Sequence, residues 1–160
     1  MLGRFSGRVH RQTAIGTPAL PPARAAPTDA RYHRAGDPWP LYASLDPETV
    51  WAEWSAATRG AIDPATERRR LWHIDVDRLR VLDLRVPAVR AELAVEVGEL
   101  TGPRGAAQQT LAAKAEALGA EGMIVPSAAH GGHWNVVVFP SAFSRLAVAG
   151  STSTRPKPPA

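Results

Sequence analysis

The sequence predicts a single α+β domain, with a β-sheet surrounded by helices. Helix-like and strand-like segments both occur, but they do not alternate regularly along the chain, which disfavours a doubly wound parallel sheet. The chain has 160 residues, enough for one domain with a real core. Hydrophobic residues make up 44% and charged residues 21% of the chain, values typical of globular proteins.

Strands are expected where short apolar or alternating runs lie between turn residues. These segments are residues 8–15, 40–44, 71–76, 81–84, 122–126, 134–140 and 143–149. The Pro- and Ala-rich segment 17–29 is expected to be an irregular loop.

The clearest helix begins at Asp46 and Pro47, which combine an N-cap residue with a proline at the first helical position. This helix is expected to end near Thr58. Its apolar stripe consists of Val50, Trp54 and Ala57. Further helices are expected over residues 87–97 and 106–118.

The net charge of +4 is concentrated near the N-terminus. Residues 1–40 contain six arginines and two acidic residues, and six minus two accounts for the whole net charge. This distribution suits an anionic partner, either a nucleic acid or the pyrophosphate of a small cofactor. The same distribution is also compatible with an ordinary solvated basic surface.

Several function classes are disfavoured by what the sequence lacks. Without cysteine there can be no disulfide, cysteine-ligated metal or cysteine nucleophile. No apolar run reaches the length of a membrane span, and the N-terminus lacks the apolar core of a signal peptide. A cytoplasmic location is therefore expected. The polar, proline-rich segment 150–160 is expected to be a disordered tail after a domain over residues 5–149.

Local motifs do not identify the chemistry. Phosphate-binding glycine loops, a GxGxxG fingerprint and an HExxH helix are all missing. His130 and His133 have no third ligand nearby in sequence, so no metal is expected. A hydrolase triad of Ser127, His73 and Asp75 is disfavoured because no GxSxG turn surrounds the serine.

Four polar residues are candidates for a site, although each also has an ordinary explanation. Glu53 lies in an apolar part of its helix, but it could be a solvated glutamate. Tyr42 could be a core aromatic residue, and Arg11 and Arg31 could be surface arginines.

Four sequence blocks, taken in order, resemble the RES-domain family. They are RVHRQT at 8–13, RYHRAGDPWPLYASLDPETVWAEW at 31–54, LWHIDVDRLRVLDL at 71–84 and GAEGMIVPSAAHGGHWNVVVFP at 119–140. Several blocks in order are much harder to match by chance than one short motif. Two positions depart from the family pattern: Gln12 replaces an aromatic residue, and Ala30 replaces a glycine.

The resemblance implies an ADP-ribosyltransferase-like fold, with a split mixed β-sheet core that binds NAD among surrounding helices. It implies a toxin of a toxin–antitoxin system that degrades NAD by phosphorolysis or hydrolysis. Inorganic phosphate is then a possible co-substrate, no metal is needed, and the partner is an Xre-type helix-turn-helix antitoxin. Direct binding to nucleic acid or to a membrane is not implied.

The resemblance assigns catalytic roles to Glu53, Arg31 and Ser127, and NAD binding to Arg11, Arg31, Tyr42 and Ser127. A carboxylate such as Glu53 can stabilise an oxocarbenium-like ribose. Guanidinium groups bind phosphate oxygens, and the Tyr42 ring can stack on the nicotinamide. Ser127 is expected to orient the ribose. Two alternatives remain: a mono-ADP-ribosyltransferase that modifies a protein, and a non-catalytic module that binds nucleic acid or protein.

Overall fold

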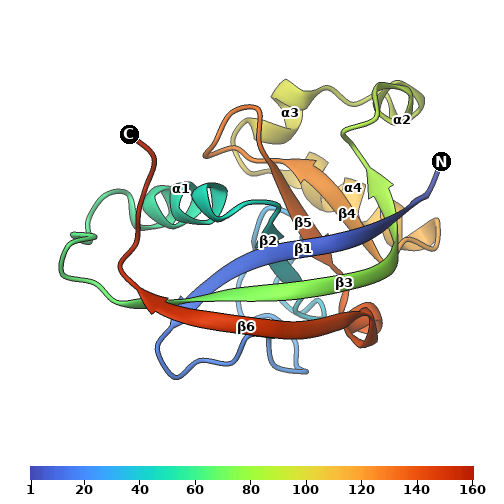
Figure 1. Ribbon diagram of the computed structural model, residues 1–160. Coiled ribbons are helices and arrows are strands. Elements are labelled where there is room, and N and C mark those ends of the chain that lie inside the picture. Colours follow the sequence, from blue (N-terminus) through green and yellow to red (C-terminus); the bar gives the residue numbers. More distant parts are fainter.

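The computed structural model describes residues 1–160 and shows strands and helices mixed along the chain (Figure 1). In chain order, the elements are β1 (Gly3–Ala14), β2 (Leu41–Ser44), α1 (Pro47–Thr58), β3 (Arg69–Asp83), α2 (Pro87–Leu93), α3 (Val97–Thr101), α4 (Ala106–Ala117), β4 (Gly122–Pro126), β5 (Trp134–Val138), a 3₁₀ helix (Pro140–Arg145) and β6 (Leu146–Thr154). The predicted α+β class, with a mixed sheet and helices packed around it, is confirmed.

The sheet has the strand order β1-β2-β5-β4-β3-β6, and β1 also pairs with β3. This extra pairing closes the first five strands into a barrel-like ring, with β6 attached outside β3. Strands β3 and β4 are parallel and the other neighbouring strands are antiparallel. Strands β1 and β2 share only the residue pair His10 and Ser44. The ring is therefore split between these two strands.

Two apolar clusters hold the ring and the helices together. The first draws on all five ring strands and includes Val9, Leu41, Ile74, Leu79, Val81, Ile124, Val136 and Val138. The second joins the sheet to α2, α3 and α4 through Leu82, Leu84, Val89, Leu100, Leu111, Met123 and Val137. Helix α1 lies apart from these helices, beside β1 (Figure 1).

Helix α1 begins and ends as its sequence predicts. The Asp46 carboxylate accepts hydrogen bonds from the Thr49 amide and hydroxyl, which caps the first turn. The helix ends at Thr58, and Arg59 follows in the left-handed conformation with φ 52°. Val50 and Trp54 are buried as expected, and Trp51 is buried with them against Leu71 of β3. Ala57, the third residue of the expected stripe, is exposed.

Three predictions about the elements are wrong in detail. Residues 71–76 and 81–83 belong to the single strand β3, which ends before Leu84, and the helix expected over 87–97 divides into α2 and α3. The disordered tail expected from residue 150 is wrong for residues 150–154, which are part of β6. These polar residues form a strand because the edge of β3 offers them main-chain hydrogen bonds, and β6 itself stays largely exposed.

None of the helices combines the length and the apolar character that crossing a bilayer requires.

Candidate active site

A cavity of about 650 Å³ opens at the split between β1 and β2, next to α1. Arg11, Arg31, Tyr42 and Glu53 line this cavity, so the structure brings together four of the five predicted site residues. Its other polar or aromatic lining residues are His10, Gln12, Trp39, Ser44, Trp54, Arg59, Arg104 and Asn135.

Glu53 is the only acidic residue in the cavity lining. Its Oε1 atom accepts hydrogen bonds from Ser127 Oγ at 2.7 Å and from Asn135 Nδ2 at 2.7 Å. Both bonds end on Oε1, and no protein group donates to Oε2. One oxygen is therefore anchored by the protein while the other is available to a ligand.

Ser127 lies behind Glu53 instead of in the cavity lining. It follows β4, is only 2% exposed, and donates its hydroxyl proton to Glu53. The Ser127 oxygen in turn accepts from the backbone amides of Ala129 and His130. The structure thus gives Ser127 a direct contact with the carboxylate, whereas the sequence predicted a contact with the ribose.

Asn135 on β5 was missed by sequence reasoning. The Ser44 hydroxyl donates to Asn135 Oδ1 at 2.7 Å, which turns the amide nitrogen of Asn135 toward Glu53. A polar side chain inside the β-branched run WNVVVF is the signal that could have found it, because a buried amide needs hydrogen-bond partners.

The guanidinium groups in the cavity have no acidic partner. Burial lowers the pKa of Arg11 to about 10, and its buried Nη1 atom has no hydrogen-bond partner. Arg31 Nη1 donates to the carbonyl oxygens of Leu100 at 3.1 Å and Gly102 at 2.6 Å, which fixes that side chain against the end of α3. Arg11 stays charged at neutral pH, and an anion would supply the acceptor that its Nη1 atom lacks.

Tyr42 presents its ring to the cavity, while its hydroxyl is fully used elsewhere. His33 Nε2 donates to the Thr28 carbonyl, so in the neutral ring Nδ1 accepts from the Tyr42 hydroxyl at 2.8 Å. The same hydroxyl accepts from the Tyr32 amide. Burial raises the pKa of Tyr42, so the phenol stays protonated. This geometry suits stacking and disfavours a role in proton transfer.

In a comparison with known protein families, the RES domain family matches residues 6–156. The chain belongs to the RES domain family. It is 31% identical over 150 residues to the "Probable NAD(+) phosphorylase Rv3189" of Mycobacterium tuberculosis, which covers 93% of this chain and 68% of that relative.

A solved structure supports the same fold. The crystal structure of the M. tuberculosis MbcT–MbcA toxin–antitoxin complex matches this RES domain with a TM-score of 0.80 and 24% sequence identity. The match covers 97% of this chain and 87% of that chain. At this identity, the likeness establishes the shared fold.

The hydrolase triad considered from sequence does not exist in this RES domain. The Ser127 hydroxyl is bound to Glu53. His73 Nδ1 instead faces His10 Nδ1 at 2.8 Å, and the Asp75 carboxylate pairs with Arg8 on the surface.

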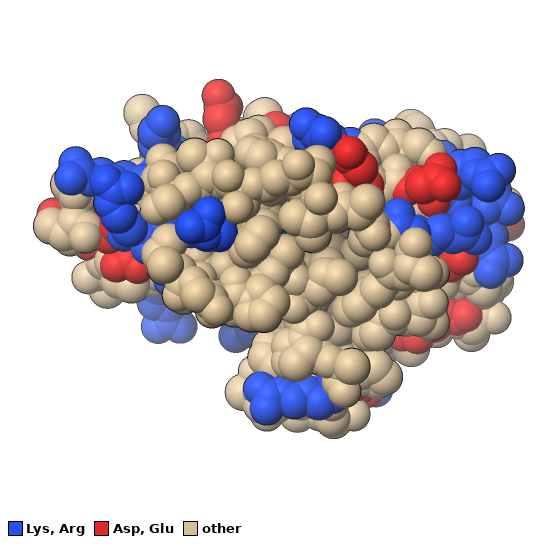
Figure 2. Space-filling model, turned by 60° about the horizontal axis from the view of Figure 1, so that its bottom comes forward, with Lys and Arg blue, Asp and Glu red and all other residues tan.

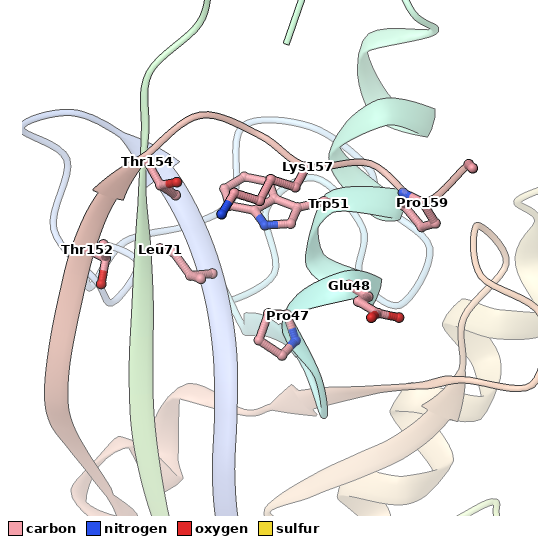
Figure 3. A pocket seen from close by; sticks show the side chains of 9 residues that line it. Pro47, Glu48, Trp51, Leu71, Thr152, Thr154, Lys157 and Pro159 are labelled. Atoms are coloured by element: carbon pink, nitrogen blue, oxygen red, sulfur yellow. The ribbon is translucent and has the colours of Figure 1, made fainter. Parts of the chain in front are cut away.

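A second cavity of about 600 Å³ contains none of the predicted site residues (Figure 3). It lies between α1, the ends of β3 and β6, and the C-terminal segment. Its lining residues are Pro47, Glu48, Trp51, Leu71, Thr152, Thr154, Lys157, Pro159 and Ala160. The close-up shows Lys157 beside the Trp51 ring. The first cavity is therefore the candidate site, because four of the predicted site residues line it.

Proposed function

We propose that this RES domain cleaves the bond between nicotinamide and ribose in NAD, with inorganic phosphate as the acceptor. The observation that carries the proposal is the anchored Glu53 carboxylate, with its free Oε2, among four arginines in one cavity. A single negative group among positive ones suits a substrate that carries a pyrophosphate and develops positive charge on its ribose. The relative named as a probable NAD(+) phosphorylase supports the same chemistry.

Each group has a role in this proposal. The pyrophosphate binds to Arg11 and Arg31, and the nicotinamide ring stacks on Tyr42. As the bond from ribose C1′ to nicotinamide breaks, its electron pair leaves with nicotinamide, and the positive charge spreads over C1′ and the ring oxygen. Glu53 stabilises that charge through Oε2. A phosphate oxygen then bonds to C1′, which gives ADP-ribose 1-phosphate.

Ser127 and Asn135 act as positioning residues in this scheme. Each donates to Oε1 of Glu53 from a different strand end, so the carboxylate is oriented before NAD arrives. Such preorganised groups stabilise a transition state without a cost of reorientation. Arg31 contributes to catalysis by holding negative charge in a fixed place, because α3 orients its guanidinium group.

The test is to follow nicotinamide release from NAD by the pure chain, with and without inorganic phosphate. Release that rises with phosphate concentration supports phosphorolysis. Nicotinamide release at a rate that does not change with phosphate concentration indicates hydrolysis. Transfer of label from NAD to a lysate protein indicates mono-ADP-ribosylation. Absence of release under all three conditions overturns the proposal.

A non-catalytic role in nucleic-acid binding is less well supported. Figure 2 shows Lys and Arg side chains at the two ends of one face, interspersed with acidic residues, and a largely uncharged middle. A nucleic-acid interface is expected to carry a basic patch or stripe along one face. Salt-sensitive DNA binding without NAD turnover would favour this alternative.

The biological setting that fits this activity is a cytoplasmic toxin controlled by an antitoxin of the Xre helix-turn-helix type. The matching solved structure is a complex of a toxin with its antitoxin. Expression of the chain alone should stop bacterial growth, and the Glu53→Gln variant should not. Co-expression of a helix-turn-helix protein encoded next to this gene should restore growth.

A further inference from the structure

A second polar cluster lies at the N-terminal end of α1, on the far side of the loop that carries Ser127. It consists of Asp46, His130 and His133, and one ligand atom of each lies within 4.8 Å of the other two. All three side chains are only partly buried, so an ion can reach them from solvent. Sequence reasoning missed the third member, because Asp46 is far from the histidines along the chain.

The hydrogen bonds around the cluster fix the protons on both histidine rings. The Thr49 hydroxyl uses its only proton to donate to Asp46. Its oxygen therefore accepts a hydrogen bond from His130 Nδ1, at 3.0 Å. A carboxylate oxygen can only accept, so His133 Nδ1–H donates a hydrogen bond to Asp46 Oδ2 at 3.1 Å. In neutral rings, this leaves a free lone pair on each Nε2 atom. No other protein group uses these Nε2 atoms.

The two rings are stacked, with centroids 3.6 Å apart and 5° between their planes. Neutral imidazole is the form that binds metals.

We infer that Asp46, His130 and His133 form a binding site for a divalent transition metal of the zinc class. Two imidazoles and one carboxylate are a common three-ligand set for zinc, with water in the fourth position. Two ligands of a tetrahedral zinc lie about 3.3 Å apart, given bonds of about 2.0–2.1 Å. His133 Nδ1 and Asp46 Oδ2 lie 3.1 Å apart, so this pair can coordinate one ion once the Nδ1 proton moves to Nε2.

Metal binding has a structural consequence that can be measured. Parallel rings cannot both direct a lone pair at one ion, so one ring must turn and the stack must open. If His133 coordinates through Nδ1, its proton moves to Nε2 of the same ring, which is 39% exposed. Thr49 then supports the site from behind by holding Asp46 and His130.

The site also touches the proposed active site through the backbone. The His130 amide donates to Ser127 Oγ, and the Ser127 amide donates to the His133 carbonyl. An ion that ties this loop to Asp46 would hold Ser127 in its place against Glu53. Metal binding itself does not depend on the proposed NAD chemistry. A negative result for the metal site would therefore leave the proposed NAD cleavage untouched, and the reverse also holds.

The experiment uses the full chain without a histidine tag and without NAD. Zinc affinity is measured by competition with a chromogenic chelator, and magnesium serves as the hard-ion control. The variants are His133→Asn and Asp46→Asn; the second keeps an N-cap residue and so keeps α1 folded. His73→Asn is the matched control, because His73 also faces another histidine at 2.8 Å.

The expected result is saturable binding of one zinc per chain that weakens about tenfold or more in His133→Asn and Asp46→Asn. His73→Asn should bind like the wild type, and magnesium should not compete. In NMR spectra, zinc should move the ring signals of His130 and His133 as the stack opens. Wild-type affinity in His133→Asn, loss of binding in His73→Asn, or no saturable binding would overturn the inference.

Discussion

Ser127 Oγ lies 2.7 Å from Glu53 Oε1 and joins the end of β4 to the middle of α1. Asn135 of β5 donates to the same oxygen from a second direction. The carboxylate is therefore held by two strands although it belongs to a helix. A charged group fixed in this way can act on developing charge without first having to be reoriented.

Replacement of Glu53 with Gln should abolish nicotinamide release. The amide has nearly the same shape, and its oxygen can still accept from Ser127 and Asn135, so the fold should be kept. The negative charge that stabilises the ribose cation is lost, and the rate should fall by about a hundredfold or more. Melting temperature and turnover are measured on the same sample. Full activity in Glu53→Gln would show that the site is wrong.

Replacement of Ser127 with Ala should lower kcat while leaving KM for NAD nearly unchanged. Ser127 is 2% exposed and absent from the cavity lining, so we expect it to orient the carboxylate and to make no contact with NAD. A hydrogen bond to a charged group contributes about 1.5–3 kcal/mol, which corresponds to a rate loss of about ten- to a hundredfold. Ser141→Ala, at an exposed position, is the control. A rise in KM alone would instead place Ser127 in contact with substrate.

The sequence was sufficient for the fold class and for the four cavity residues, because each lies in a block with a recognisable order. Asn135 was not predicted as a site residue, because its partners, Ser44 and Glu53, are distant in sequence. No local pattern reveals hydrogen bonds of this kind. The second part of β6, residues 150–154, was missed for a related reason: these residues are polar, and only the edge of β3 makes them a strand. Tertiary context, which local propensity does not contain, decided both cases.

Replacement of Arg11 with Met should stabilise the fold while weakening NAD binding. The guanidinium is largely buried without an acidic partner, and burial lowers its pKa to about 10. A basic group whose pKa is lower in the folded than in the unfolded protein reduces the free energy of unfolding at every pH below its folded pKa. At neutral pH this reduction is therefore complete. Arg11→Met removes the cost and the anion contact together. The control is Arg8→Met, which removes an exposed partner of Asp75.

The two Arg11 readouts are the urea midpoint at pH 7 and the KM for NAD. We expect a higher midpoint and a raised KM in Arg11→Met, with little change of either in Arg8→Met. A lower midpoint in Arg11→Met would mean that the buried guanidinium stabilises the free protein, and an unchanged KM would exclude it from the pyrophosphate site.

Replacement of Asp46 with Ala should lower the free energy of unfolding by about 1 kcal/mol, because α1 loses its N-cap. Asp46→Asn should lower the free energy of unfolding much less.

The charge of Asp46 makes this stability depend on pH. Burial opposes the charged form of Asp46, but hydrogen bonds from Thr49 and His133 outweigh the burial and lower the pKa of the carboxyl. The stabilisation by the charge is therefore complete above the unfolded pKa of about 3.9 and is lost as the pH falls through the folded pKa.

Urea unfolding of the wild type and Asp46→Asn, with a chelator present to remove zinc, tests this pH dependence. The difference between their free energies of unfolding should shrink as the pH drops below about 4. A difference that stays constant into the acid range would show that the Asp46 charge makes no contribution to the cap.

Replacement of Gly122 with Ala should destabilise the sheet at the start of β4. An added Cβ atom would collide with the Val137 carbonyl oxygen and would come within 3.1 Å of Leu79 Cδ2. The carbonyl belongs to the neighbouring strand β5, so relief requires a backbone shift, and overpacking of this kind costs about 1–3 kcal/mol. Gly131→Ala is the control, because nothing lies within 4 Å of its added atom. Equal urea midpoints for the two variants would mean that β4 and β5 can separate locally, and the positions of Ser127 and Asn135 beside Glu53 would then be less rigid than their hydrogen bonds indicate.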